Sequence, residues 1–266
     1  MVEMTQSKAG GVSIVSATNE RGERVDVSLV EERPLTIFVD KQEVVTLMTM
    51  GGFPELLVIG YLKNQLIYGQ PSDIKLVQVD WETEAVAVVS KRGKKDLAKL
   101  KERKTITTGC GQGTMFGDVL ESLKGLVLTK HILKQSSLYS LLAYLAKYNN
   151  VYKTAGAVHG CALCKDEEVL FFVEDVGRHN AVDTIAGYMW LNNIKGDDCV
   201  FYTTGRLTSE MVIKVAQMGI PTLLSRSGAT KMGFDIAKQF GVTLISRAKG
   251  KHFHILNGMD NVRLDV

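Results

Sequence analysis

One cysteine of this chain lies between two glycines, within residues 107–114, and its surroundings indicate a reactive thiol. Glycine allows backbone conformations that other residues avoid and lets a second molecule approach closely. The basic run at 91–104 comes just before this loop and carries eight lysine or arginine residues against two acidic ones. Cationic neighbours favour the thiolate, which is the nucleophilic form of cysteine. We therefore predict that Cys110 carries out the chemistry of this protein.

Three later loops, at 174–180, 203–210 and 225–230, each combine a glycine, an arginine and small hydroxyl or amide side chains. Each follows an apolar run and precedes an amphipathic stretch, which is where an open α/β sheet has its ligand crevice. Helix N-termini attract phosphate, and arginine adds bidentate contacts. Helix capping by residues such as Asn180 and Thr208 is the alternative. Taken together, the loops predict a phosphorylated ligand, with a nucleotide as one candidate.

A second group of cysteines occurs in the segment 159–164, which reads His-Gly-Cys-Ala-Leu-Cys. A CxxC with a nearby histidine can bind zinc or act as a redox pair. A structural zinc site needs four ligands, however, and a second cysteine pair is missing. The segment also has the apolar character of a buried strand, so we favour core positions for Cys161 and Cys164. Cys199 opens another apolar strand, and we expect it to be buried.

The elements that position these residues change in character along the chain. Up to about residue 125 the pattern is β-rich, with one short helix predicted at 54–62, where Pro54 is tolerated in the first turn. The helix at 136–148 has the clearest helical spacing of apolar residues. Beyond residue 150, apolar runs alternate with amphipathic stretches, which predicts a largely parallel sheet covered by helices. Strands are expected at 12–16, 25–30, 35–39, 74–79, 84–90, 169–173, 200–203, 222–224 and 242–245.

The bulk composition is that of an ordinary globular protein, with 266 residues of which 45% are hydrophobic and 23% are charged. The net charge is only +3, so the basic character is concentrated in 91–104. This distribution suits an anionic ligand or an acidic partner better than nucleic acid. No apolar run approaches the roughly 18 residues of a membrane span, and the N-terminus lacks a signal pattern. Four cysteines do not make a disulfide scaffold, so we expect a cytoplasmic protein without membrane contact.

Several distinctive motifs are spread over most of the chain. The run at 174–183, Glu-Asp-Val-Gly-Arg-His-Asn-Ala-Val-Asp, is the most specific of them. The others are Glu32-x-Pro34-Leu35 with Met48, the Gly-Cys-Gly loop at 109–111, Val158-His159, Gly205-Arg206 with Glu210-Met211, the segment 227–230, and Thr243-Leu244 followed by Lys249-Gly250. Together they resemble the FdhD/NarQ family, the sulfur carriers that formate dehydrogenases need in order to become active.

This resemblance implies a sulfurtransferase-type carrier that accepts persulfide sulfur from a cysteine desulfurase on Cys110. It would deliver the sulfur to the molybdenum or tungsten bis(molybdopterin guanine dinucleotide) cofactor, a cargo and not a permanently bound metal, before insertion into formate dehydrogenase. The cofactor-binding segment falls by motif match on Arg247, Ala248, Lys249, Gly250, Lys251 and His252. From the loops we add Arg178, His179, Arg206, Ser227 and Thr230 as candidate contacts.

The resemblance also implies a homodimer and a C-terminal part similar to the cytidine deaminase fold. From the change in pattern along the chain, we expect residues 126–266 to form this layered α/β domain and residues 1–125 a smaller β-rich domain. Because the chain has no H-x-E and no P-C-x-x-C motif, deamination is not expected. The alternative function is a cofactor-binding chaperone that transfers no sulfur.

Two departures from the family pattern bear on mechanism. The family usually has a second cysteine three residues after the first, and Gly113 stands at that position here. A mechanism that needs a disulfide between these two positions is therefore excluded, whereas a single persulfide carrier is not. The Thr-Pro pair that usually follows the methionine is replaced by the sequence Thr49-Met50-Gly51-Gly52.

Overall fold

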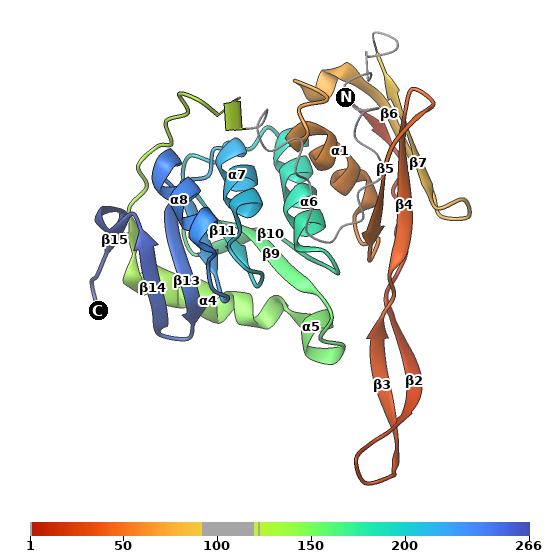
Figure 1. Ribbon diagram of the computed structural model, residues 1–266, viewed down its shortest axis with the longest axis horizontal. Helices are drawn as coiled ribbons and strands as arrows, with labels where there is room; N and C mark the ends of the chain where they lie inside the picture. The colour runs from red at the N-terminus through yellow and green to blue at the C-terminus, as the bar shows by residue number, and fades with distance from the viewer. Residues whose placement is uncertain (1, 92–119, 122) are drawn as a thin grey trace.

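The computed structural model describes residues 2–91, 120–121 and 123–266, so Cys110, Gly113 and all of the basic run except Lys91 lie outside the described residues. The spacing of Leu97 and Leu100 predicts a helix in that run, and this helix is likewise outside the described residues. Two sheets, each with its own core, lie on either side of a contact between two helices (Figure 1). The two helices are α1 (Pro54–Asn64) and α6 (Arg178–Leu191).

The N-terminal part is built on a five-stranded sheet with the order β1-β6-β7-β4-β5. Its buried side chains follow the period of two expected for strands with one covered face, as in Leu35, Ile37 and Val39. The apolar side of α1 packs on this face and closes the core. The strands span Glu3–Met4 (β1), Arg33–Val39 (β4), Gln42–Thr49 (β5), Ile74–Asp80 (β6) and Ala85–Ser90 (β7), and the 3₁₀ helix η1 is Pro71–Asp73. The strands and the helix predicted here are confirmed.

A long hairpin extends from this part of the molecule (Figure 1). It consists of β2 (Val12–Thr18) and β3 (Arg24–Val30), which form a two-stranded sheet of their own. The alternating apolar residues that predict these strands are present, but most of the hairpin's residues are exposed.

The C-terminal part contains a six-stranded sheet with the order β10-β9-β11-β12-β13-β14. The four predicted strands, β10 to β13, all run in one direction, but β9 and β14 run the opposite way, so only the pairs β11–β12 and β12–β13 are parallel neighbours. The sheet is therefore mixed, and the prediction of a largely parallel sheet holds only for the direction of those four strands. Two hairpins cause the difference, because β9 with β10 and β13 with β14 are joined by tight turns, which only antiparallel neighbours allow. The strands span His159–Lys165 (β9), Glu168–Asp175 (β10), Cys199–Thr203 (β11), Thr222–Ser225 (β12), Thr243–Lys249 (β13) and His252–Asn257 (β14).

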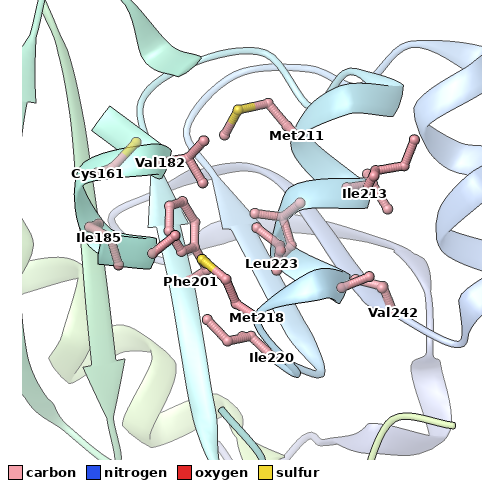
Figure 2. Close-up of a cluster of buried hydrophobic side chains, with 14 of the residues drawn as sticks. Cys161, Val182, Ile185, Phe201, Met211, Ile213, Met218, Ile220, Leu223 and Val242 are labelled. Atoms are coloured by element: carbon pink, nitrogen blue, oxygen red, sulfur yellow. The ribbon is translucent and has the colours of Figure 1, made fainter. Parts of the chain in front are cut away.

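Helices cover both faces of this sheet. One face packs against α6, α7 (Ser209–Gln217) and α8 (Lys231–Phe240), and Figure 2 shows side chains of this core, including Phe201, Met211 and Leu223. The other face packs against α4 (Gln135–Tyr148), as predicted from its apolar spacing. The remaining elements are α5 (Asn150–Thr154), the pair β8 (Leu133–Lys134) and β15 (Val262–Arg263), and the 3₁₀ helix η2 (Met259–Asn261).

The architecture is thus a mixed α/β fold with several sheets. The domain boundary at 125/126 and the likeness to the cytidine deaminase fold stay predictions. Within the part of the chain that the structure describes, no helix is long and apolar enough to cross a membrane.

Candidate functional site

The three predicted ligand loops converge on one edge of the six-stranded sheet. Because β11 and β12 are parallel, Thr203 lies beside Ser225 at their carboxyl ends. The amide of Arg226 donates to the carbonyl of Thr203 at 3.2 Å. Strand β9 runs antiparallel to β11, so its first residues reach the same edge, where Thr204 N donates to Gly160 O at 2.9 Å. Residues far apart in sequence therefore form one continuous rim.

A pocket of about 580 Å³ opens at this rim. Ser227 and Lys249 are the two predicted cofactor contacts that line it. The other lining residues are Tyr152, Gly156, Ala157, Val158, His159, Thr204 and Arg226. Thr204 and Arg226 belong to the predicted ligand loops, but neither was predicted as a contact residue. Tyr152 carries no signal in the sequence, because its place at the pocket depends on where α5 packs.

The pocket is electrostatically suited to an anion. None of the described residues that line it carries a carboxylate, whereas Arg226 and Lys249 are cationic. The hydroxyl of Tyr202, beneath the rim, accepts a hydrogen bond from Arg226 and so helps to hold the guanidinium in place. Burial, followed by the charges of Arg178 and Arg206, lowers the pKa of His159, which favours its neutral form.

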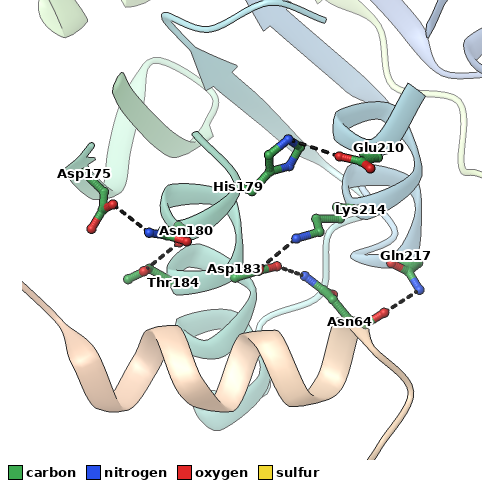
Figure 3. Close-up of polar contacts among 9 residues, drawn as sticks. All are labelled: Asn64, Asp175, His179, Asn180, Asp183, Thr184, Glu210, Lys214 and Gln217. Carbon is green, nitrogen blue, oxygen red and sulfur yellow. Dashed lines mark hydrogen bonds and ion pairs between the residues drawn. The ribbon is translucent and has the colours of Figure 1, made fainter. Parts of the chain in front are cut away.

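Arg178 and His179 lie at the first turn of α6, next to the pocket and not in its lining. The side chain of Arg178 packs over Gly205, where an added Cβ would lie only 3.1 Å from the Arg178 Cδ. His179 lies beside α7 with its Nε2 3.1 Å from Glu210 Oε2 (Figure 3). Burial, followed by the charges of Lys214 and Arg178, lowers the pKa of His179 to about 2. His179 is therefore a neutral imidazole at the helix contact.

Of the residues considered as helix caps or ligand contacts in these loops, Thr230 caps a helix with its side chain, whereas Thr208 and Asn180 do not. Thr230 is the N-cap of α8, and its Oγ1 accepts a hydrogen bond from Gly233 N at 3.1 Å. Thr208 is the N-cap residue of α7 but makes no side-chain cap bond. The prediction that Asn180 caps a helix is wrong, because α6 begins two residues earlier with Gly177 as its N-cap.

The most specific motif, at 174–183, mainly ties the two parts of the molecule together. Asn180 Nδ2 donates to the carbonyl of Met48 at 2.6 Å and to Asp175 Oδ1 at 2.9 Å. Asp175 Oδ2 accepts from the hydroxyl of Thr49 at 2.5 Å. Burial raises the pKa of Asp175, and hydrogen bonds to its carboxylate oppose this shift. Deeper in the interface, Asp183 accepts from Asn64 and from Lys214 (Figure 3).

The residues of segment 247–252 differ in where they point, because side chains alternate between the two sides of β13. Lys249 points into the pocket, whereas the side chain of Ala248 is fully buried in the core and leaves only its backbone for a ligand. Arg247 N donates to the carbonyl of Ser227 at 2.9 Å, which places it beside the rim. The remaining three residues form the exposed turn and the start of β14: Gly250, Lys251 and His252.

The cysteines of the described part do not form a metal or redox site. Cys161 and Cys164 are three residues apart on β9, so they point to opposite faces of the sheet and join different cores. Burial raises the pKa of Cys161 to about 12 and of Cys199 to about 11, and it also raises the pKa of Cys164. The described residues hold no cluster of metal-ligating side chains. These cysteines occupy the core positions predicted for them.

Fold and site together define a mixed α/β protein with a cationic pocket at one edge of its sheet. The family model of the FdhD/NarQ family matches residues 30–263, and the chain belongs to this family.

Several relatives match nearly the whole chain. The chain is 28% identical over 244 residues to the sulfur carrier protein FdhD of Listeria monocytogenes serotype 4b (strain F2365), covering 90% of this chain and 93% of the relative. It is 28% identical over 248 residues to the sulfur carrier protein FdhD of Bacillus subtilis (strain 168), covering 92% and 94%. The fold matches a crystal structure of a formate dehydrogenase accessory protein from Desulfotalea psychrophila, with a TM-score of 0.76, 24% identity and coverage of 96% and 99%.

Proposed function

We propose that this protein is a sulfur carrier for the maturation of formate dehydrogenase, with Cys110 as the carrier thiol. The observation that carries this proposal is membership of the FdhD/NarQ family over residues 30–263, with relatives named as sulfur carriers. The remaining cysteines support the choice of thiol. The chain has four cysteines, and three of them are buried in the cores with raised pKa values. Cys110 is the fourth.

In the loading step, the Cys110 thiolate attacks the terminal sulfur of a persulfide on a cysteine desulfurase. The sulfur–sulfur bond of the donor breaks, the desulfurase cysteine leaves as a thiolate, and the new persulfide forms on Cys110. This exchange moves one sulfur atom without net oxidation or reduction. The lysines and arginines of 91–104 favour the attacking thiolate.

In the delivery step, the terminal sulfur passes to a molybdenum or tungsten bis(molybdopterin guanine dinucleotide) cofactor, which is the cargo. Release of that sulfur as sulfide takes up two electrons. Because Gly113 occupies the position of the usual second cysteine, external thiols must supply these electrons and become a disulfide.

The pocket beside Arg226, Ser227 and Lys249 is the proposed place for the phosphorylated end of this cargo. Its two cations and the absence of carboxylates from the described lining support this assignment. Arg178 and Arg206 add positive charge at the rim. We also propose that the protein forms a homodimer and that it contacts the desulfurase and formate dehydrogenase directly.

Intact mass spectrometry tests the carrier role. We expect incubation with a cysteine desulfurase and cysteine to add the mass of one sulfur atom to the wild-type protein and none to Cys110→Ala. Cys161→Ala serves as the matched control and should load like the wild type. Absence of a mass gain on a wild-type protein whose Cys110 thiol is shown to be free would contradict the proposal.

The second candidate function is a cofactor-binding chaperone that transfers no sulfur, and Gly113 is the residue that favours it. Under this alternative, the Cys110→Ala protein would still fully activate formate dehydrogenase. Under the sulfur-carrier proposal, the same variant would leave the enzyme inactive.

A further inference from the structure

The chemistry of the pocket lining changes along the rim of the sheet. Before β9, the lining residues Tyr152, Ala157 and Val158 supply an aromatic ring and aliphatic groups. Further along the sheet, the ends of β11, β12 and β13 supply hydroxyls and the two cations, Arg226 and Lys249. A pocket of this kind fits a ligand with a planar apolar ring at one end and an anionic group at the other.

The backbone of Tyr152 is fixed by a buried carboxylate. Glu174, only 8% exposed, accepts a hydrogen bond from the amide of Val151 at 3.0 Å and one from the amide of Tyr152 at 2.9 Å. These bonds tie α5 to the end of β10. The ring is therefore presented from a short helix whose position at the pocket is set by the sheet.

The ring of Tyr152 differs from the rings of its neighbours along the chain. Tyr148 packs against Phe172 with ring centroids 5.2 Å apart, and the Nζ of Lys147 lies 5.0 Å from the ring centre of Tyr144. Among the described residues, no aromatic or cationic side chain covers Tyr152, and 43% of this residue is exposed.

We propose that Tyr152 is the stacking platform for the ring of a nucleotide whose phosphates bind at Arg226 and Lys249. This proposal rests on the proposed cargo-binding role of the pocket and adds the residue that recognises the ring. Stacking is tolerant of the kind of base, because every base has a flat π face. Tyr152 therefore contributes affinity for the ring, and the phosphates bind at the two cations at the ends of β12 and β13.

The test compares two probes that share phosphates but differ in the ring. Binding of pyrophosphate and of GDP is measured by calorimetry on the wild-type chain and on the variants Tyr152→Ala and Tyr152→Phe. We expect Tyr152→Ala to weaken GDP by about tenfold or more, the usual effect of losing one base–aromatic contact. Pyrophosphate affinity should stay unchanged in both variants, and Tyr152→Phe should bind GDP like the wild type. Tyr144→Ala, an exposed tyrosine away from the pocket, should change neither.

Three results would overturn the proposal. These are unchanged GDP affinity in Tyr152→Ala, an equal loss for GDP and pyrophosphate, and a wild-type chain that binds GDP no better than pyrophosphate. Persulfide loading of Cys110, followed by intact mass, is independent of these titrations. Failure of the stacking role can therefore be told apart from failure of the sulfur-carrier function.

Discussion

Gly60 of α1 and Gly187 of α6 face each other where the two helices cross. A Cβ atom added to Gly60 would lie 2.6 Å from the backbone nitrogen of Gly187 and 1.7 Å from the carbonyl oxygen of Asp183. A Cβ atom added to Gly187 would lie 2.0 Å from the carbonyl oxygen of Leu56. The backbones of the two helices are therefore in direct contact, which holds the N-terminal sheet against the part of the molecule that carries the pocket.

This contact predicts a large cost for the smallest added side chain. Gly60→Ala or Gly187→Ala should lower the free energy of unfolding by about 3 kcal/mol or more, because the clash is with backbone that cannot rotate away. Denaturant titration measures the effect. Gly69→Ala is the matched control, since its Cβ would meet nothing within 4 Å and should change stability by less than about 0.5 kcal/mol. Stability equal to wild type in the Gly60 variant would contradict this packing.

The buried ion pair next to this crossing gives a second prediction. Lys214 Nζ lies 2.7 Å from Asp183 Oδ2, and the two side chains are 9% and 3% exposed. Lys214→Met should lower the free energy of unfolding by about 3–5 kcal/mol, because it leaves a buried carboxylate without its cation. Adding Asp183→Asn should recover part of that loss. The exposed pair of Lys231 and Asp235 provides the control, and Lys231→Met should cost less than about 1 kcal/mol.

His179 predicts how stability depends on pH. Its pKa is about 2 in the folded protein, against an ordinary value of 6.5. Below pH 6.5, His179 binds a proton in the unfolded chain but stays neutral in the folded protein. The free energy of unfolding therefore falls as the pH falls toward 2. Between pH 7 and 5.5 the wild type should lose about 1 kcal/mol more than His179→Gln.

Thermal or denaturant unfolding at several pH values measures this difference. His254→Gln, which changes an exposed histidine of β14, should keep the wild-type dependence on pH. Parallel curves for the wild type and His179→Gln would show that the imidazole is not held neutral.

The cysteines predict the outcome of a thiol titration. Cys161, Cys164 and Cys199 are fully buried, and burial raises their pKa values, so they should react slowly in the folded state. The sulfur-carrier proposal requires Cys110 to react. One fast equivalent of a thiol reagent is expected for the wild type and none for Cys110→Ser. A second fast equivalent in the folded protein would mean that one of the three core thiols is accessible.

Local patterns in the sequence were sufficient to predict most helices and strands, and to predict the sheet edge where the three loops meet. Apolar spacing predicts α4 and most strands of both sheets, because burial of one face imposes a period of 3.6 or 2 on the chain. The strands β1, β5 and β14 were not predicted. The three loops with glycine, arginine and hydroxyl groups do meet at one rim. The family motifs also predict the family to which the chain belongs.

Long-range packing decided what those patterns could not. The hairpins that make the sheet mixed depend on turn geometry, and a run of apolar residues does not reveal the direction of its neighbour. Tyr152 reaches the pocket only because Glu174 fixes α5 against the sheet. Asn180 has the composition of a cap, yet its side chain bonds Met48, 132 residues away, because the contact between α1 and α6 brings the two segments together.

The sequence by itself therefore determined the kinds of groups available: a glycine-flanked thiol, a set of cationic loops and three cysteines of core character. Only the tertiary structure decided which of these groups share a site. It placed Lys249 in the pocket and Ala248 in the core, one residue apart, because successive side chains of a strand point to opposite faces. It also assigned the most specific motif, at 174–183, mainly to holding the two parts together, since hydrogen bonds across the interface satisfy its buried polar groups.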